Sequence, residues 1–382
     1  MIRGGEPYDM KTVCEEDKCT GCTACVAICP HNAITISDTM KSLNAVINET
    51  ACINCGACKR ICQVNYPIKK AMAPVKWYQG WAEESDIRLS AASGGAATVI
   101  EQDFINNGGY VCSCTFVKGK FVYCITNKIE DIKNFKGSKY VKSDSSGVYK
   151  EIRLLLKQGN KVLFVGLPCH VAGVKKYVGE NLSELLFTVD LICHGSPSQK
   201  LLKLFLEQHD KKTDHLNTIE FRRNSDYRLM CNDQLISEPG CMDKYSMGFL
   251  KSLFNTDNCY ECAYAKKERI SDITLGDSWG ASFSKEEQKK GISLILCQTE
   301  KGQRLIEESK LRLFDVDIDE AIRNNHQLSH PSVKPDKLRE KFFAELYKGE
   351  KVDKLVRSCY PKSSFKQKVK GMMFKLFRSH EK

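Results

Sequence analysis

Two runs of four cysteines near the N-terminus constrain this chain more than any other feature of its sequence. Both runs have the spacing Cys-x2-Cys-x2-Cys-x3-Cys, offset by 33 residues: Cys19, Cys22, Cys25 and Cys29 form the first, and Cys52, Cys55, Cys58 and Cys62 form the second. Three thiolates on a tight loop can bind three corners of one metal cluster, while the fourth begins a helix and faces away. The repeat predicts a small metal-binding domain over residues 1–70.

Residues 1–70 closely resemble the bacterial two-cluster ferredoxins, in which the fourth cysteine of each run ligates the other cluster. We therefore expect two [4Fe-4S] clusters in an α+β, ferredoxin-like domain. The expected ligands are Cys19, Cys22, Cys25 and Cys62 for the first cluster, and Cys52, Cys55, Cys58 and Cys29 for the second. Zinc knuckles are the alternative, but they use two spaced CxxC pairs and not two complete runs. Gln63 stands where the first run has Pro30, and Cys14 stays unassigned.

Composition indicates where these thiols function. The chain has 20 cysteines in 382 residues, and nine of them lie in residues 1–70. No apolar run approaches the ~18 residues that a membrane span requires. The first residues lack the apolar segment of a secretory signal. Because the thiols of an unsecreted chain stay reduced, we expect metal ligands and not disulfides, in a cytoplasmic protein.

The net charge of +11 is concentrated at the C-terminus, where residues 351–382 carry ten basic and two acidic side chains. A nucleic-acid-binding domain would carry this excess on a folded face, so we expect no nucleic-acid partner. Apolar residues recur in this tail at helical spacing: Phe365, Val369, Met372, Met373, Leu376 and Phe377. A basic amphipathic helix suits peripheral contact with the inner face of a membrane, or a partner's groove. Docking on its own protein is the alternative.

Residues 77–350 alternate patterns of strand and helix. We expect a hairpin over 110–125, buried strands over 161–165 and 185–192, and helices over 93–104, 147–158, 168–178 and 198–209. A shorter hairpin is expected within the first domain, over 33–36 and 45–47, and a linker over 72–77. Strand–loop–helix units in succession predict a larger α/β domain with a mostly parallel, helix-covered sheet.

Four cysteines of this larger domain are candidates for a third cluster. Cys169 and Cys193 each follow the carboxyl end of a predicted strand, where the loops of open α/β sheets line the ligand crevice. Cys259 and Cys262 form a CxxC pair. Four thiolates suffice for a cubane, but loop cysteines can equally pack in the core, and a CxxC pair can be a redox dithiol. The remaining cysteines of the domain read as ordinary packing: Cys112, Cys114, Cys124, Cys231, Cys241, Cys297 and Cys359.

An ordered series of motifs in this region resembles the coenzyme F420 hydrogenase and dehydrogenase beta subunit family, which also includes 7-hydroxymethyl chlorophyll a reductase. The series comprises Gly137–Val141, Gly166–Cys169, Asp190–Gly195, Phe221–Arg223, Cys259–Cys262 and Asp272–Gly280. The resemblance implies a bound FAD beside an iron–sulfur cluster held by Cys169, Cys193, Cys259 and Cys262. His170 stands where members often have glutamine.

With this resemblance we expect FAD contacts in two segments. Ser93, Gly94 and Gly95 open a helix whose free N–H groups can receive a phosphate, although close packing at a helix start is the alternative. The second segment offers two lysines, a hydroxyl and an aromatic ring, unless it is simply a solvated turn: Lys136, Gly137, Ser138, Lys139 and Tyr140.

Three further positions have two interpretations each. His194 is the candidate proton donor beside the flavin, although a lone histidine in such a loop is more often a structural hydrogen bonder. Arg222 and Arg223 either recognise an anionic substrate or end a solvated strand. Asp277 and Trp279 are expected to close the site by packing and hydrogen bonding.

The sequence as a whole predicts an FAD-dependent iron–sulfur oxidoreductase. Electrons would pass between a ferredoxin-type carrier and a hydride-exchanging substrate, with coenzyme F420 as the candidate that the resemblance implies. A non-catalytic electron-transfer subunit that docks on a partner redox enzyme is the alternative, and a scaffold with purely structural clusters is a third.

Overall fold

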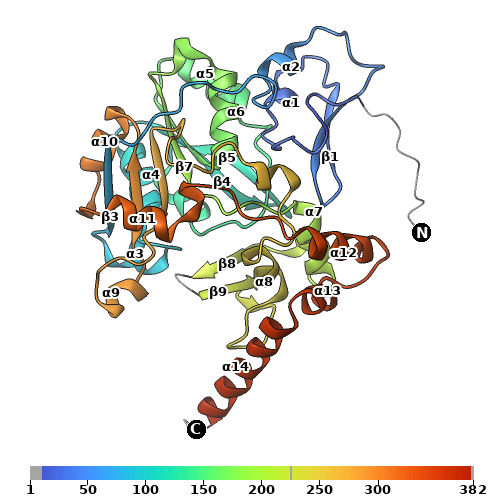
Figure 1. Cartoon of the computed structure of the whole chain (residues 1–382). Helices are drawn as coiled ribbons and strands as arrows, with labels where there is room; N and C mark the ends of the chain where they lie inside the picture. Colours follow the sequence, from blue (N-terminus) through green and yellow to red (C-terminus); the bar gives the residue numbers. More distant parts are fainter. Residues whose placement is uncertain (1–10, 224–225, 380–382) are drawn as a thin grey trace.

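The computed structural model describes residues 11–223 and 226–379, with side chains as far as Phe374. The first ten residues of the predicted metal-binding domain and the last three of the tail lie outside the described residues. Figure 1 shows the cysteine-rich segment as a separate unit at one end of a larger α/β body.

The first domain is built on the predicted hairpin. Strand β1 (Ile34–Asp38) pairs antiparallel with β2 (Leu43–Ile47), with Ile34 opposite Ile47. Each cysteine run passes from a loop into a five-residue helix, α1 (Ala24–Ile28) or α2 (Ala57–Ile61). Both helices begin after a left-handed residue, Thr23 at φ 59° and Gly56 at φ 71°. In each run this turn falls between the second and third cysteines, and the helix then carries the chain onward, so the fourth thiol leaves the loop.

An eight-stranded sheet forms the body. Its strands lie in the order β13 (Leu311–Phe314), β3 (Lys76–Ala82), β12 (Ser293–Cys297), β11 (Ile273–Asp277), β7 (Leu186–Leu191), β6 (Val162–Gly166), β4 (Tyr110–Val117) and β5 (Lys120–Thr126). In this sheet β4, β6, β7 and β11 are parallel to one another, and the other pairings are antiparallel.

The prediction of a mostly parallel sheet is therefore wrong, and the sheet is mixed. Strand β3 pairs antiparallel with both of its neighbours, β12 and β13. Those neighbours come from a part of the chain about two hundred residues later. The local succession of strand, loop and helix therefore does not determine the direction in which β3 enters the sheet.

Helices cover both faces of this sheet. On one face, α4 (Ala96–Asn106) and α10 (Glu300–Glu307) bury apolar residues against the strands. On the other, α5 (Tyr149–Lys157) and α6 (Pro168–Val178) do the same. Adjacent residues of β4 divide between the two cores, Val111 with the first and Cys112 with the second, as strand alternation requires. Shorter helices occupy the loops: α3 (Ser85–Ser90), α9 (Lys285–Lys289) and α11 (Ile318–Asn324).

A helical layer beside a small sheet completes the body. The sheet contains β8 (Ile219–Arg223), β9 (Asp226–Cys231) and β10 (Gln234–Leu235), and the helices are α7 (Gln199–Glu207), α8 (Lys244–Leu250), α12 (Asp336–Tyr347) and α13 (Val352–Cys359). Helix α13 falls within the predicted tail, yet its Val352, Leu355 and Val356 are buried in this core.

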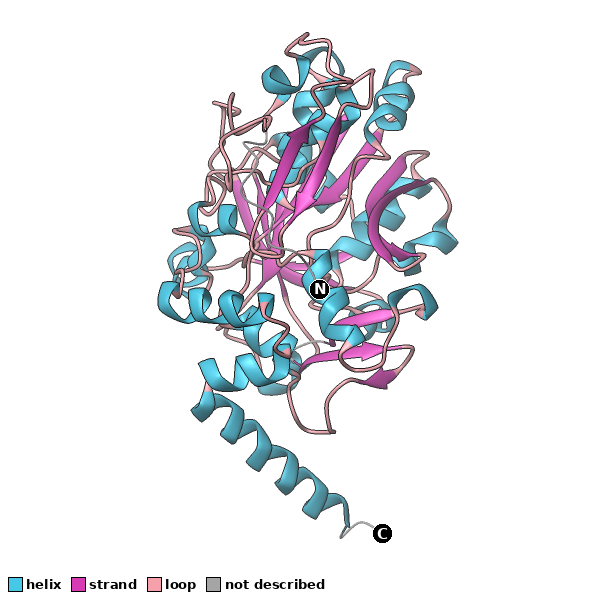
Figure 2. Cartoon of the chain, turned by 90° about the vertical axis from the view of Figure 1, so that its right-hand side faces the viewer, coloured by secondary structure: helices cyan, strands magenta, loops and turns pink. Residues whose placement is uncertain are grey.

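Helix α14 (Pro361–Ser379) extends away from the body (Figures 1 and 2). One side of it lies against the loop that precedes α8, where the Cys241 thiol contacts the Gln367 carbonyl oxygen at 3.2 Å. On another side Phe365 and Met372 are exposed; the side chains of Leu376 and Phe377 lie outside the described residues. Within the part of the chain that the structure describes, no helix has the length and apolarity to cross a bilayer.

Candidate functional site

The cysteines predicted to hold the second cluster surround one hollow. It is lined by Cys29 from the first run and by Cys52, Cys55 and Cys58 from the second, with Ile34 and Ile47 of the hairpin beside them. The structure therefore brings together the set that the spacing predicts, including the cysteine exchanged between runs.

The cysteines predicted for the first cluster also lie together. Burial raises the pKa of the Cys25 thiol, and the next contributions come from the charges of the other three, Cys22, Cys19 and Cys62. Cys14, which the spacing leaves unassigned, lies beside two of this set, and hydrogen bonding to it lowers the pKa of the Cys62 and Cys19 thiols. Among the described residues, no group of three or more His, Cys, Asp or Glu side chains is arranged around a single ion position. Ligation by these cysteines stays a prediction.

The four candidates for a third cluster converge from distant parts of the chain. Cys169 lies in the first turn of α6, directly after β6, and Cys193 follows β7. Cys259 lies in a 3-10 helix, η4 (Asp257–Glu261), and Cys262 follows it. Burial raises the pKa of the Cys169 thiol and the nearby Lys142 lowers it; the other charges acting on it are those of Cys193, Cys262 and Cys259. Ligation of a third cluster by these four cysteines stays a prediction.

The first and third sets of cysteines are neighbours across the domain boundary. A Cβ atom placed on Gly173 would lie 3.1 Å from Cys22 Cβ, so α6 presses directly on the first cysteine run. Gly173 is four residues after Cys169 on the same helix, a rise of about 6 Å. The Gln63 side chain donates a hydrogen bond of 2.7 Å to the Cys169 carbonyl oxygen. The spacing argument misses Gln63, although its replacement of the expected proline is a visible signal.

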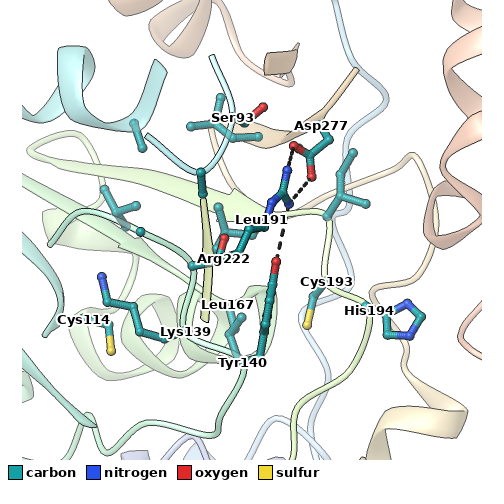
Figure 3. Close-up of a pocket in the computed structure, with 18 of the residues that line it drawn as sticks. Ser93, Cys114, Lys139, Tyr140, Leu167, Leu191, Cys193, His194, Arg222 and Asp277 are labelled. Atoms are coloured by element: carbon teal, nitrogen blue, oxygen red, sulfur yellow. Dashed lines mark hydrogen bonds and ion pairs between the residues drawn. The ribbon is translucent and has the colours of Figure 1, made fainter. Parts of the chain in front are cut away.

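A cavity of about 340 Å³ opens at the carboxyl ends of β6 and β7 (Figure 3). It collects most of the residues predicted to contact FAD: Ser93, Gly95, Lys136, Gly137, Ser138, Lys139 and Tyr140. Cys193 and His194 lie in its wall as well. Gly94 does not line it, because a Cβ there would lie 2.4 Å from the Gly80 carbonyl oxygen. For Gly94 the packing interpretation therefore fits better than the phosphate one.

An arginine–carboxylate pair stands at one side of this cavity. Arg222 donates two hydrogen bonds to the Asp277 carboxylate, of 2.6 and 2.7 Å, and a longer one of 3.4 Å to the Tyr140 hydroxyl (Figure 3). The Tyr140 ring stacks on Phe249, with 4.3 Å between centroids. Arg223 is paired with Glu220 of its own strand. Of the two arginines, Arg222 alone lines the cavity, and Asp277 fixes its guanidinium in a bidentate orientation.

A second group of polar side chains also lines this cavity. Glu101 is buried, and this burial raises the pKa of its carboxyl to about 7. The Lys139 ammonium donates to the carbonyl oxygens of Phe135 and Lys136, and Figure 3 places its side chain beside Cys114. Two ionisable groups thus face the cavity from a low-dielectric wall.

His194 is held by hydrogen bonds on both ring nitrogens. Nε2 lies 3.0 Å from the Ser252 hydroxyl, and Nδ1 lies 2.8 Å from the Gln327 side-chain nitrogen, which can only donate. Nδ1 is then the acceptor and Nε2 carries the proton. Burial lowers the pKa of His194, so the ring is neutral at pH 7. These contacts favour the structural interpretation, while the proton-donor role stays a prediction.

Comparison with known proteins places this architecture. Residues 159–315 match the family described as the C terminus of the beta subunit of coenzyme F420 hydrogenase/dehydrogenase, and residues 18–66 match the 4Fe-4S dicluster domain. Residues 159–315, less than half of the chain, are similar to the F420 hydrogenase/dehydrogenase beta subunit family. The matched segment of this family contains Cys169, Cys193, Cys259, Cys262 and Arg222, and the dicluster match contains all eight cysteines of the two runs. The chain is thus an iron–sulfur protein with a beta-subunit-type α/β domain behind a 4Fe-4S dicluster domain.

Among solved structures, a chain of the F420-reducing [NiFe] hydrogenase complex from Methanosarcina barkeri is similar to this one. The two share 17% sequence identity over 78% of this chain and 92% of that chain, with a TM-score of 0.47. A search of the curated proteins finds no match.

Proposed function

We propose that this chain is an FAD-dependent iron–sulfur oxidoreductase. Electrons would travel between a ferredoxin-type carrier or partner redox subunit and a hydride-exchanging substrate, by way of three [4Fe-4S] clusters and one FAD. The flavin supplies the chemistry that links a two-electron hydride to the one-electron steps of the clusters. The protein's own residues bind these groups, exclude water from them and set their order.

The observation that carries the proposal is the composition of the 340 Å³ cavity. The first turn of α4 faces it, and the unpaired N–H groups of a helix N-terminus favour a phosphate. Lys136 adds positive charge, Tyr140 a stacking surface, and Cys193 the connection to the third set of thiols. Residues that can hold a phosphate, stack on a ring and ligate a cluster therefore line one cavity, as a dinucleotide cofactor beside a cluster requires.

The packing of α6 supports a short route between the clusters. Cys169 and Gly173 lie one turn apart on this helix, and Gly173 contacts Cys22 of the first cysteine set. The third set therefore lies between the dicluster domain and the cavity. This order fits electron transfer in either direction between the protein surface and a buried flavin.

Metal and flavin analysis of anaerobically purified protein tests the proposal. We expect about twelve iron atoms and one FAD per chain, since three cubanes hold four irons each. About eight irons without flavin would contradict it and leave only the dicluster domain loaded. If flavin is bound, a panel of anaerobic donors comprising reduced ferredoxin, reduced F420 and NAD(P)H identifies the partner that reduces it.

The second candidate is a non-catalytic electron-transfer subunit. The family match favours this candidate because the family is named for a subunit of hydrogenases and dehydrogenases. Such a subunit would hold its clusters and be reduced by a carrier, yet turn over no donor in the panel without its partner. Turnover of reduced F420 or NAD(P)H by the isolated chain would exclude this candidate. The cytoplasmic location remains a prediction in both cases.

A further inference from the structure

Lys142 is a buried lysine without an evident counter-charge. Only 4 % of its surface is exposed. Its backbone N–H donates to the Pro197 carbonyl oxygen at 2.7 Å, but among the described residues no ion pair or hydrogen bond engages its ammonium group. Burying an ammonium group is costly unless an anion compensates it, so a negative group is expected next to this side chain.

The candidate negative group is a cluster bound by four nearby cysteines. Burial alone would lower the pKa of Lys142, but the charges of the four cysteines predicted to hold the third cluster outweigh it and raise this pKa above its ordinary value: Cys259, Cys169, Cys193 and Cys262. Free thiols are neutral at pH 7 and would leave the ammonium uncompensated. A cubane held by four thiolates carries about −2 in its usual oxidised state.

The stem of Lys142 reaches toward the other domain. A Cβ atom placed on Gly21 would lie 3.5 Å from both Cγ and Cδ of Lys142, and Gly21 lies between Cys19 and Cys22 in the first cysteine run. Lys142 therefore lies between the first and third sets of cysteines.

We propose that Lys142 is the resident counter-charge of the third cluster and raises its reduction potential. This inference rests on the proposed third cluster. Reduction adds one electron to a group that is already anionic, and a buried cation stabilises the reduced state more than the oxidised one. The effect is large in a site from which water is excluded, because charges are little screened there. Net charge and local environment are the means by which proteins set cluster potentials.

The test is an anaerobic redox titration of the full chain, followed by the EPR signals of the reduced clusters. Lys142→Met keeps the stem and removes the charge, whereas Lys142→Arg keeps a charge. Lys176→Met is the matched control: Lys176 is a half-buried lysine on α6 that interacts with Cys62 and Cys22 of the first set. We expect Lys142→Met to lower the reduction potential of one cluster by at least about 59 mV, which is a tenfold change in the equilibrium constant of a one-electron couple. Lys142→Arg should shift this potential less, and Lys176→Met should leave it unchanged.

Iron content separates this inference from the proposed function. Wild-type protein with about eight irons would remove the third cluster and the inference with it. A fully loaded Lys142→Met protein whose three potentials match the wild type would overturn the role of Lys142 alone. If Lys142→Met loses about four irons while Lys142→Arg retains them, the need for a cation is supported. Loss of those irons from both variants would show that the cluster requires the shape of the lysine side chain and not its charge. This result would also overturn the role of Lys142 as a counter-charge.

Discussion

The side-chain amide of Gln63 donates a hydrogen bond of 2.7 Å to the backbone carbonyl oxygen of Cys169. The amide oxygen of Gln63 accepts the hydroxyl of Tyr264, so both ends of this buried side chain are used. Gln63 directly follows one predicted ligand of the first cluster and contacts a predicted ligand of the third. It therefore connects two cysteine sets across the 106 residues that separate Gln63 from Cys169.

Gln63→Leu should weaken the docking of the two domains. The substitution leaves a buried carbonyl oxygen and a buried hydroxyl without their partner, which costs about 1–3 kcal/mol for each such group. We expect a lower melting temperature of the anaerobic holoprotein, with iron content unchanged. Gln63→Glu keeps the acceptor for Tyr264 and loses the donor to Cys169, so it should fall between Leu and the wild type. Equal melting temperatures for all three proteins would show that the contact does not stabilise the interface.

Local spacing is sufficient to predict the dicluster domain. Each run holds three of its cysteines on one loop, and the two runs are related by a repeat, so the resemblance to two-cluster ferredoxins that they carry predicts Cys29 beside Cys52, Cys55 and Cys58, where the structure places it. The βαβ part of the body is equally predictable, since the strand ends at Cys169 and Cys193 are marked by buried apolar runs. These features depend on neighbours in sequence.

Tertiary contacts cannot be predicted in the same way. Lys142 has no partner within its own segment, and its setting arises only when β6, β7 and η4 bring four thiols around it. The antiparallel direction of β3 cannot be predicted from local sequence because β3 pairs with β12. In this pairing Trp77 lies opposite Leu296, and these residues are far apart in the chain. The structural interpretation of His194 likewise depends on Ser252 and Gln327, which reach its two nitrogens from other segments.

Cys193→Ala and Cys112→Ala should have different effects on iron content. Cys193 lies in the cavity wall and in the third cysteine set, whereas Cys112 is fully buried in the sheet core. We expect Cys193→Ala to lower iron from about twelve to about eight atoms per chain and Cys112→Ala to keep about twelve. Iron analysis together with EPR of the reduced protein measures this. Equal iron in the two variants would contradict Cys193 as a ligand.

Lys136→Ala should weaken flavin binding. The Lys136 side chain lines the same cavity as the first turn of α4, and its ammonium donates a hydrogen bond of 3.2 Å to the Ser90 hydroxyl. A hydrogen bond from an ammonium to a phosphate contributes about 1.5–3 kcal/mol, so the dissociation constant should rise roughly tenfold or more. Lys133→Ala, which removes an exposed lysine three residues earlier, is the control. Flavin retained after gel filtration gives the comparison, and identical retention in both variants would argue against a phosphate at Lys136.

Glu101→Gln should flatten the pH dependence of stability. Burial raises the folded-state pKa of Glu101 to about 7 from an ordinary 4.5, so the folded protein keeps a proton that the unfolded chain loses within this range. The contribution of this group to the free energy of unfolding is therefore complete below about pH 4.5. It falls by roughly 3 kcal/mol as the pH rises through 7. Melting temperatures between pH 5.5 and 8 should therefore fall in the wild type and less in Glu101→Gln. The exposed Glu130→Gln should follow the wild type; a Glu101→Gln profile that does the same would refute the assignment.

Vesicle binding by α14 can be tested without deleting the helix. Deletion would also remove Gln367, whose side-chain oxygen accepts the Met242 backbone N–H at 3.0 Å, and would disturb the body. Phe365 and Met372 are 69 % and 55 % exposed on the free side, so Phe365→Ser with Met372→Ser removes apolar surface and keeps every lysine. Full burial of such a side chain in a membrane contributes about 1.5–3 kcal/mol. If the helix lies on anionic membranes, the double variant should bind anionic vesicles at least tenfold more weakly in a sedimentation assay, and neither protein should bind zwitterionic ones. Undiminished binding by the double variant would show that the basic side chains alone cause vesicle binding. Absence of binding by the wild type would favour a protein partner for this face of α14.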